Sequence, residues 1–556
     1  MTKNPEKFQK RVVDIAVRAG AMAKAVVTPQ FDKDSQFIQD PAQRVKGVAA
    51  ALTGGALMLA SSGVSASNHI TPEEAVLIAP IWAQSVQDYE AVFGQSPSEE
   101  MFASAHQVVE NILKADTSAP TATQAGMMLA SAVSTSKTDG ILERARVIAM
   151  VLPVFLRCAT NDAVTLIPAG KDVAEIFRVH TIAGTTSGEL TKGEVIAEGT
   201  VKQFSQQRQR YEFVAAQQPD GTKKDFTFTS VTDLPSKKAH KIKLDTSKIL
   251  VNRKPVAKEI GGQFIGIADV GGTNVTFTCS VDHDTGVFTV NTGAETLADG
   301  VKLHVIFEID IENAAELIPK IQHKMSSVEV RPFEVAMGSE LSIQAMHKMQ
   351  REHGVDSLAM LVSTMTNLVS YETDTRRLLD MTFYASAANE AFNKYTAPNA
   401  YFKEVYEQFG EYVSGVSKAM LAANKKSGIK VGYAGSNAST FIQALPSNLF
   451  TPNPSYVQSP QLNFLGTLRG GIRIYEVPFA LPDLTTDQIL WCGKGQNHGD
   501  AGYIAGTAIP VIMHNHETQT DLIKRNTLWG SEYGELHPDN GEAYFIKSTI
   551  VDTAPV

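Results

Sequence analysis

The stretch from Gly470 to Val511 constrains the fold of this chain more than any other part of the sequence. It holds short apolar runs bounded by glycine and proline, a pattern that predicts buried β-strands joined by tight corners. No residues in it are arranged like a nucleophile with its base, so we interpret it as scaffold. The expected strands are residues 472–477 and 489–491 and a third that opens with Asp500-Ala501-Gly502-Tyr503 and is expected to close at Pro510.

The composition is that of an ordinary globular protein. The chain has 556 residues, 43% hydrophobic and 20% charged, and a formal net charge of −9. This length suits about two to four domains with their own cores. The acidic balance argues against binding of nucleic acid through a general basic surface. The three cysteines lack CxxC spacing, which argues against a thiolate zinc site.

The N-terminal region is expected to be helical. Residues 5–118 show helical spacing, with helix starts at Thr71-Pro72 and at Ser98-Glu99-Glu100. Because the region is not very hydrophobic, we interpret it as an arm or appendage more than a packed domain. Residues 47–68 carry no charge but are rich in small residues, so we expect a helical hairpin there and no membrane span.

The middle of the chain changes from helical to β periodicity. A further helix is expected over residues 136–158, followed by a strand, a turn and a strand over 163–186. From residue 193 to 330 the apolar period is two, and turn signals such as Pro219-Asp220-Gly221 separate the runs. This pattern predicts a small barrel or sandwich inserted between two mixed regions.

A long helix is expected to start at Asp356 as its cap. Its apolar stripe is Leu358, Leu361, Met365 and Leu368. Charges then replace the stripe, so we expect the helix to be packed at one end and exposed, or in contact with a partner, at the other. The charged residues singled out here are Glu372, Asp374, Arg376 and Arg377. Beyond Val431 we expect strands and loops, ending in an irregular aromatic tail from Trp529 to Phe545.

The segment Asp269-Val270-Gly271-Gly272-Thr273-Asn274 is the sharpest enzymatic candidate. It resembles the first phosphate loop of sugar kinases in the actin-like ATPase family. Its context is an all-β stretch with hairpin turns on both sides, and a second phosphate loop is not evident. We therefore favour a Gly-Gly turn in which Asp269 makes a local hydrogen bond.

Other motifs carry still less chemistry. His514 and His516, with His498 upstream, imitate a metal-dependent nuclease motif, but we favour a solvated loop after Pro510. Gly493-Lys494-Gly495 lacks the spacing of a P-loop, and no GxSxG elbow is present. The sequence thus predicts no catalytic, cofactor-binding or metal-binding residue, and no cofactor.

Three segments together resemble a known family, the major capsid proteins of tailed bacteriophages of the T-even type. Residues 328–381 resemble its strand-to-spine-helix segment, with the turn Glu352-His353-Gly354-Val355-Asp356 before the helix. Residues 142–178 resemble the family's entry into the body. The C-terminal stretch is similar to the family through Gly470-Gly471, Arg473 to Tyr475, Gly493-Lys494-Gly495, Asp500 to Tyr503 and Ile509-Pro510-Val511.

This resemblance implies the α+β capsid fold named after phage Hong Kong 97, with an N-terminal arm, an extended loop, a peripheral domain with a long spine helix and an axial domain. The inserted β-rich module belongs to the extended loop. The implied domains are 1–135, a helical arm and scaffolding-like segment; 136–192, the entry helix and first peripheral strands; 193–327, the extended loop with its insertion; 328–430, the peripheral domain; and 431–556, the axial domain and return strands.

The resemblance also implies a function. The chain would be a structural protein and no enzyme, assembling into hexamers and pentamers of the icosahedral head around double-stranded phage DNA. Glu372, Asp374, Arg376 and Arg377 would then be candidates for contacts between subunits. Implied partners are copies of itself, scaffolding, portal, vertex and decoration proteins, a prohead protease and DNA held without sequence-specific contact. The implied location is the virion, assembled in the host cytoplasm. The alternatives are an encapsulin-like shell protein and the sugar kinase.

Overall fold

The structure is a computed structural model that describes most of the chain in two compact units, Met1–Phe177 with Ser327–Val556, and Arg178–Ser326. The residues it describes are 5–32, 36–52, 72–93, 95–115, 148, 152, 155–156, 158–167, 174–187, 189–196, 204–234, 237–353, 357–385, 389–395, 402–495, 499–516, 523–538 and 540–554.

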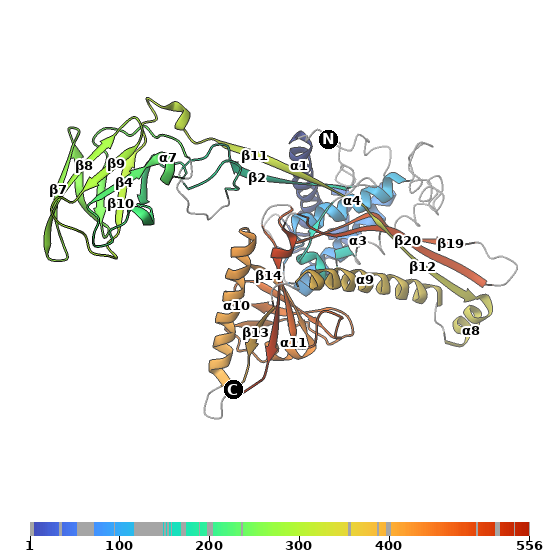
Figure 1. Cartoon of the computed structure of the whole chain (residues 1–556). Helices are drawn as coiled ribbons and strands as arrows, with labels where there is room; N and C mark the ends of the chain where they lie inside the picture. Colours follow the sequence, from blue (N-terminus) through green and yellow to red (C-terminus); the bar gives the residue numbers. More distant parts are fainter. Residues whose placement is uncertain are drawn as a thin grey trace. The chain divides into compact units, whose positions relative to one another are not determined.

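The described N-terminal residues are helical, as predicted (Figure 1). They form α1 (Pro5–Met22), η1 (Ala23–Val27), η2 (Thr28–Gln30), α2 (Pro41–Ala51), α3 (Pro72–Phe93) and α4 (Glu99–Ala115). The Ser98 hydroxyl accepts a hydrogen bond from the Met101 N–H at 3.4 Å, which is the predicted cap of α4. The interpretation of this region as an appendage is wrong, because Trp82 and Phe102 lie in one hydrophobic core with Tyr433.

A seven-stranded sheet contains most of the stretch that constrained the fold. Its order is β13-β21-β18-β14-β17-β16-β15, with β14 parallel to β17 and β13 parallel to β21. Its strands are β13 (Asn389–Asn393), β14 (Ile429–Gly435), β15 (Phe450–Pro452), β16 (Asn463–Leu468), β17 (Ile472–Val477), β18 (Gln488–Gly493) and β21 (Phe545–Val551). Helices α10 (Phe402–Asn424) and α11 (Ser436–Gln443) accompany it. Strand β17 is buried along its whole length, which confirms the predicted buried strand.

A four-stranded sheet of order β1-β19-β20-β12 lies in the same unit. Figure 1 shows α9 running alongside β12 and β20. Met365 and Val369 of α9 pack with Leu528 of β20. The elements are η6 (Ala159–Asp162), β1 (Thr165–Leu166), β12 (Phe333–Ser342), α8 (Ile343–His353), α9 (Ser357–Tyr384), β19 (Tyr503–Asn515), β20 (Ile523–Leu536) and η10 (Gly541–Tyr544).

The second unit is β-rich, as the period of two predicts. An eight-stranded sheet of order β3-β10-β5-β6-β7-β8-β9-β4 surrounds a core rich in phenylalanine. Its elements are β3 (Arg208–Glu212), η7 (Ala215–Gln217), β4 (Asp225–Thr229), α7 (Ser230–Asp233), β5 (Lys248–Val251), β6 (Lys254–Ile260), β7 (Gln263–Val270), β8 (Thr273–Asp282), β9 (Val287–Asn291), β10 (Leu303–Glu308) and η8 (Ala315–Leu317). Strands β2 (Ala174–Ala183) and β11 (Ile321–Val330), where the chain enters and leaves this unit, form a two-stranded sheet.

Two predictions near the C-terminus are wrong. Strand β19 does not close at Pro510 but continues to Asn515, because its pairing with β20 shifts register between Thr507 and Ile512. Such irregularities accommodate a proline that cannot donate to the ladder. The expected aromatic tail is not irregular, since β20 and β21 occupy it.

Two other expectations fall mainly on residues outside the described ranges: the helix over 136–158 and the hairpin over 47–68, of which α2 covers only the beginning. No helix in the described parts is both long and apolar enough to cross a bilayer.

Candidate assembly site on helix α9

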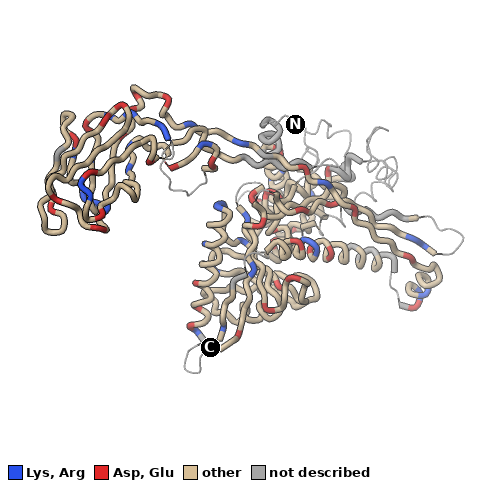
Figure 2. The backbone as a smooth tube through the Cα atoms, viewed as in Figure 1, with Lys and Arg blue, Asp and Glu red and all other residues tan. Residues whose placement is uncertain are grey.

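Helix α9 carries the four charged residues predicted as assembly contacts, and both signs of charge lie along it (Figure 2). Glu372 and Arg376 are exposed and, four residues apart, share one face of the helix. Asp374 and Arg377 are buried, with 6% and 5% of their surface exposed. An interface role therefore stays a prediction for the exposed pair, whereas the buried pair has partners inside the subunit.

Asp374 fastens the segment before β1 to α9. Its carboxylate accepts hydrogen bonds from the Ala159 N–H at 3.1 Å, the Thr160 N–H at 3.2 Å and the Thr160 hydroxyl at 2.6 Å. Burial raises the pKa of this carboxyl, and the hydrogen bonds from Thr160 and the charge of Arg377 oppose that shift. The three donors satisfy the buried carboxylate from within the subunit.

Arg377 binds the same segment. Its Nη1 donates to the Asn161 side-chain oxygen at 3.1 Å and to the Thr160 hydroxyl at 3.4 Å. Burial lowers the pKa of this guanidinium, but the negative charges around it, those of Glu532 and Asp374 among them, raise it on balance. The charged half of α9 is thus its most firmly packed half, contrary to the prediction that it would be the exposed one.

The apolar stripe of α9 is shifted from the predicted one. Met365 is buried as expected, but Leu368 is 49% exposed and Val369 is buried in its place. Consecutive residues of a helix point in directions roughly 100° apart. A modest rotation of α9 about its axis therefore decides whether Leu368 or Val369 faces the sheet. Asp356 and the side chain of Leu358 lie outside the described residues.

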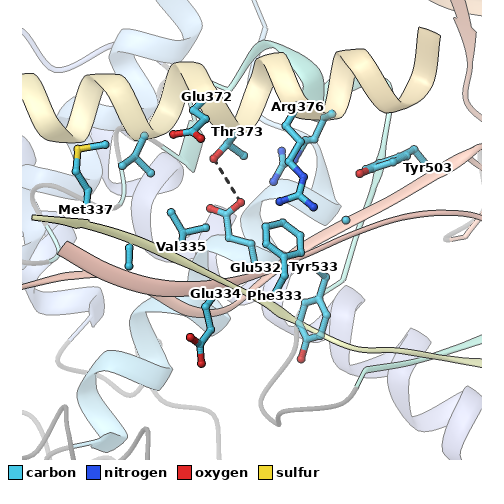
Figure 3. Close-up of a pocket in the computed structure, with 14 residues that line it drawn as sticks. Phe333, Glu334, Val335, Met337, Glu372, Thr373, Arg376, Tyr503, Glu532 and Tyr533 are labelled. Atoms are coloured by element: carbon cyan, nitrogen blue, oxygen red, sulfur yellow. Dashed lines mark hydrogen bonds between the residues drawn. The ribbon is translucent and has the colours of Figure 1, made fainter. Parts of the chain in front are cut away.

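A pocket of about 200 Å³ lies beside this cluster, between α9 and the strands β12 and β20 (Figure 3). The Arg376 guanidinium covers the ring of Phe333, with Cζ 3.8 Å from the ring centroid. Such stacking fixes the long side chain at the mouth of the pocket. Glu372 lines the same pocket, so the exposed pair borders a hollow that the subunit itself leaves open.

Glu532 forms the floor of the pocket and is 8% exposed. It accepts a hydrogen bond from the Thr373 hydroxyl at 3.4 Å. Burial raises the pKa of its carboxyl, while Arg377 and the bond from Thr373 act the other way. The sequence does not predict that Glu532 is buried in a pocket. A glutamate in the run Gly530-Ser531-Glu532-Tyr533-Gly534 looks like an ordinary strand position.

The phosphate-loop motif is a hairpin turn, as favoured from the sequence. Gly271 and Gly272 connect β7 and β8 with φ of 67° and 88°, a conformation that favours glycine. The Asp269 carboxylate accepts a hydrogen bond from the Gly272 N–H at 2.8 Å. The aspartate therefore closes the turn and has a structural role there.

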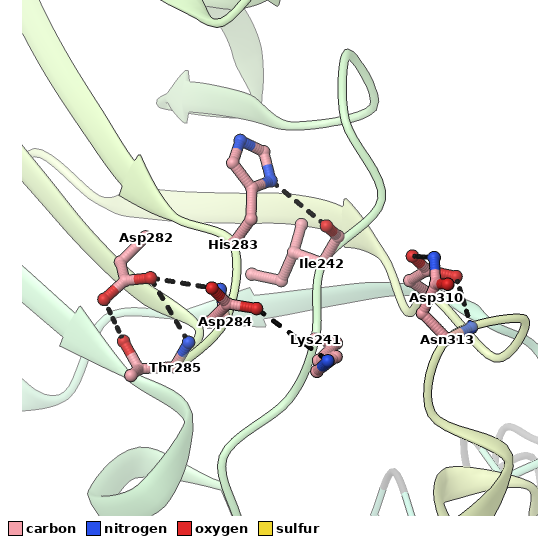
Figure 4. A network of polar contacts seen from close by, with 8 residues as sticks. All are labelled: Lys241, Ile242, Asp282, His283, Asp284, Thr285, Asp310 and Asn313. Carbon is pink, nitrogen blue, oxygen red and sulfur yellow. Dashed lines mark hydrogen bonds and ion pairs between the residues drawn. The ribbon is translucent and has the colours of Figure 1, made fainter.

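The turn after β8 is built in the same way (Figure 4). Asp282 accepts hydrogen bonds from the Asp284 N–H at 3.0 Å and from the Thr285 hydroxyl at 2.6 Å. The bond from the Thr285 hydroxyl is the main cause that lowers the pKa of Asp282. Lys241 lies 3.9 Å from the Asp284 carboxylate, so these acids are engaged in shaping the hairpin.

The prediction of a solvated loop at His514–His516 is wrong. Strand β19 extends to Asn515, which pairs with Asn526 of β20. His516 Nε2 lies 2.9 Å from the Thr527 hydroxyl. Within the described ranges, no three side chains of histidine, cysteine, aspartate or glutamate are placed to hold a metal ion together.

Comparison of the sequence with protein families gives two matches. Residues 147–505 match the family described as major capsid protein Gp23. Residues 3–158 match a domain of unknown function, DUF8615. The chain is also 34% identical over 185 residues to protein IncB of Escherichia coli, a match that covers 33% of this chain and 85% of that protein.

Comparison with solved structures gives weak likenesses to shells. The capsid of jumbo bacteriophage PhiKZ is similar with a TM-score of 0.38 and 6% identity, over 71% of this chain and 92% of the other. The capsid of the myovirus XM1 is similar with a TM-score of 0.28 and 9% identity, over 60% and 87%. An encapsulin from Synechococcus elongatus is similar with a TM-score of 0.28 and 10% identity, over 41% and 77%.

The family match covers α9 and the strands of the body from β1 to β18, and it defines the chain as a building block of a viral shell. The chain belongs to the family of the major capsid protein Gp23. The resemblance to tailed-phage capsid proteins is thereby confirmed, and the protein is a structural component that forms the icosahedral head and assembles with copies of itself.

Proposed function

We propose that copies of this chain meet through the exposed pair Glu372 and Arg376 on α9. The observation that carries the proposal is the division of the helix into two sides. Asp374 and Arg377 hold the fold together from within, while Glu372 and Arg376 border an open pocket. Charges on a rim specify the partner and its orientation more than they add affinity.

The assembly so formed consists of hexamers and pentamers around double-stranded DNA, which the shell holds without sequence-specific contact. The net charge of −9 supports this, because a strongly basic wall would bind the genome through its phosphates. Scaffolding, portal, vertex and decoration proteins and a prohead protease are further proposed partners, with assembly in the bacterial cytoplasm. No catalytic step is assigned to the chain.

Charge reversal of Glu372 tests the contact. Glu372→Lys leaves the stacking of Arg376 on Phe333 in place, so the subunit is expected to keep its melting temperature. Repulsion at the contact is expected to stop particle formation, seen by negative-stain electron microscopy. The matched control is Glu407→Lys, a charge reversal of another exposed glutamate, on α10. Particles of normal size and number from Glu372→Lys would sink the proposal.

A further inference from the structure

The second unit buries a carboxylate that faces a histidine. Glu259 of β6 is fully buried, with 0% of its surface exposed. Its Oε1 lies 2.8 Å from Nε2 of His283, in the turn between β8 and β9. Its Oε2 accepts a hydrogen bond from the Ser247 N–H at the long distance of 3.4 Å. Within the described part of the chain, no lysine or arginine forms an ion pair with Glu259. A buried carboxylate without a positive partner is unfavourable, so this site favours a positive charge on the imidazole.

The other ring nitrogen of His283 defines which tautomer is present. Nδ1 lies 3.1 Å from the Ile242 carbonyl oxygen (Figure 4). The Ile242 N–H donates back to the His283 carbonyl at 2.9 Å, so the two residues are held together twice. A carbonyl oxygen can only accept, and Nδ1 therefore carries a proton and donates it. In a neutral imidazole Nε2 is then a bare acceptor, and two acceptors 2.8 Å apart repel each other.

The pair of Glu259 and His283 therefore holds one proton more than an ionised glutamate and a neutral histidine. This proton lies either on Nε2, which gives an ion pair, or on the carboxyl group, which then donates to the ring. The number of bound protons is the same in both arrangements. In an unfolded chain the two groups are apart, and a histidine releases its proton between about pH 5 and about pH 8. Folding of the second unit is thereby linked to the binding of a proton.

The acidic groups around His283 favour its protonated form. Asp282 precedes it in the turn, and the bond from the Thr285 hydroxyl is the main cause that lowers the pKa of Asp282. The positive charge of His283 contributes to the same shift. Asp284 lies 3.9 Å from Lys241, so these two opposite charges largely offset each other. The turn thus presents a net negative charge to the imidazole.

The remaining neighbours do not compete for the proton. Burial lowers the pKa of His240, against the opposing effect of its bond to the Lys238 carbonyl, so this second histidine favours the neutral form. The bond from the Asn313 side chain lowers the pKa of Asp310, and the charge of Lys243 acts in the same direction. On β7 the residue opposite Glu259 is the apolar Phe264.

We propose that Glu259 and His283 form a proton-dependent clamp in the second unit. The closed clamp joins β6, the turn after β8 and the segment 241–247 that leads into β5. As the pH rises the proton leaves, the two acceptors repel each other, and these three parts of the unit separate locally. The clamp lies within one unit of one chain, so it goes beyond the proposed contact on α9 and does not depend on it.

Hydrogen exchange on the full, unassembled chain tests the clamp. The protection factor compares the observed rate with that of an unstructured peptide at the same pH, which removes the intrinsic effect of pH on exchange. For peptides that cover residues 241–247 and 279–286, it is expected to fall up to about tenfold per pH unit between about pH 6 and about pH 9. A protection factor that stays constant over this range would overturn the proposal.

Glu259→Gln separates the clamp from other effects of pH. The amide of glutamine can donate to a neutral Nε2 without an additional proton. Its protection factor is therefore expected to be independent of pH and to exceed that of the parent at about pH 9. The matched control is Glu212→Gln, which removes an exposed carboxylate 3.8 Å from another histidine, His304, and is expected to follow the parent. Parallel curves for the parent and Glu259→Gln would contradict the clamp.

His283→Gln decides the matter if Glu259→Gln does not fold. The side chain of His283 is 29% exposed and lies in a turn, so its replacement is tolerated more easily. Glutamine keeps a donor for Glu259 but has no proton that titrates. The protection factor of the same peptides is expected to lose the pH dependence seen in the parent. A fall as steep as that of the parent would show that the pH dependence has another origin and would refute the clamp.

Discussion

At the scale of residues, the fate of Asp374 and Arg377 shows where sequence reasoning stops. Charged residues are almost never fully buried unless they are paired. Their partners, Thr160 and Asn161, lie more than 210 positions away in sequence. The local spacing of residues along the helix therefore cannot predict these contacts. The four charges look alike in the sequence, and only the tertiary fold separates the two that hold the subunit together from the two that face outward.

Substitution of Asp374 should be costly. Asp374→Ala leaves Arg377 without its neighbouring carboxylate and two backbone N–H groups without an acceptor, which is expected to cost about 3–5 kcal/mol. Glu372→Ala, on the exposed side of the same helix, is expected to stay within roughly 0.5 kcal/mol of the parent. Urea unfolding of dissociated subunits measures both, and similar midpoints for the two variants would contradict this account.

Glu532 should make stability depend on pH. Burial raises the pKa of its carboxyl above the ordinary value of 4.5. Its contribution is therefore fully present below that ordinary value and is lost as the pH rises through the folded-state pKa. Glu532→Gln cannot ionise, so it should melt like the parent near pH 4 and at a higher temperature than the parent near pH 8. A melting-temperature difference that does not change with pH would refute this.

At the scale of elements, strands with strong periodicity were predictable and their neighbours were not. The apolar runs of β17 and β18 and the alternation of β4 and β8 stand in the sequence itself, because a strand repeats every two residues. The sequence did not show that β19 passes Pro510, since this depends on a shift of register with β20. It also did not show that α3 covers a sheet face, because this depends on Phe464 and Tyr475 far along the chain.

Replacement of Gly266 in β7 by a residue with a side chain should destabilise the second unit. A Cβ on this residue would lie 1.9 Å from the Val256 carbonyl oxygen, so main chain would have to move. Gly266→Ala is expected to destabilise the unit by about 1–3 kcal/mol. Gly338→Ala in β12, where no atom lies within 4 Å of the added carbon, is the control. Calorimetry should show a lower transition only for Gly266→Ala, and an unchanged trace would disprove the close approach.

At the scale of the whole molecule, the second unit behaves as an insertion with its ends side by side. The Gly184 N–H donates to the Lys320 carbonyl at 2.7 Å. The unit has its own core, with Phe226, Phe228 and Phe277 fully buried. The period of two predicted this module from the sequence, but the pairing of its entry and exit strands came only from the structure.

Deletion of residues 185–319, with Gly184 joined to Lys320 by a short turn, should leave the body folded. The melting temperature of the body is expected to remain within a few degrees of the parent, because its two large cores and its two smaller hydrophobic clusters contain no residue of the deleted segment. Circular dichroism and size-exclusion chromatography provide the measurement. Aggregation of the shortened chain at low concentration, where the parent stays dispersed, would count against the independence of the units.

The hydrogen bond between Arg473 and Tyr89 joins two parts of the chain that are synthesised at different times. The two residues are 384 positions apart. At ribosomal rates of roughly 5–20 residues per second, α3 emerges about 20–80 s before the strand it covers. During that interval Trp82 and Phe102 have only the other early helices to pack against. The N-terminal helices can therefore bury their sheet-facing residues only after β17 has been synthesised.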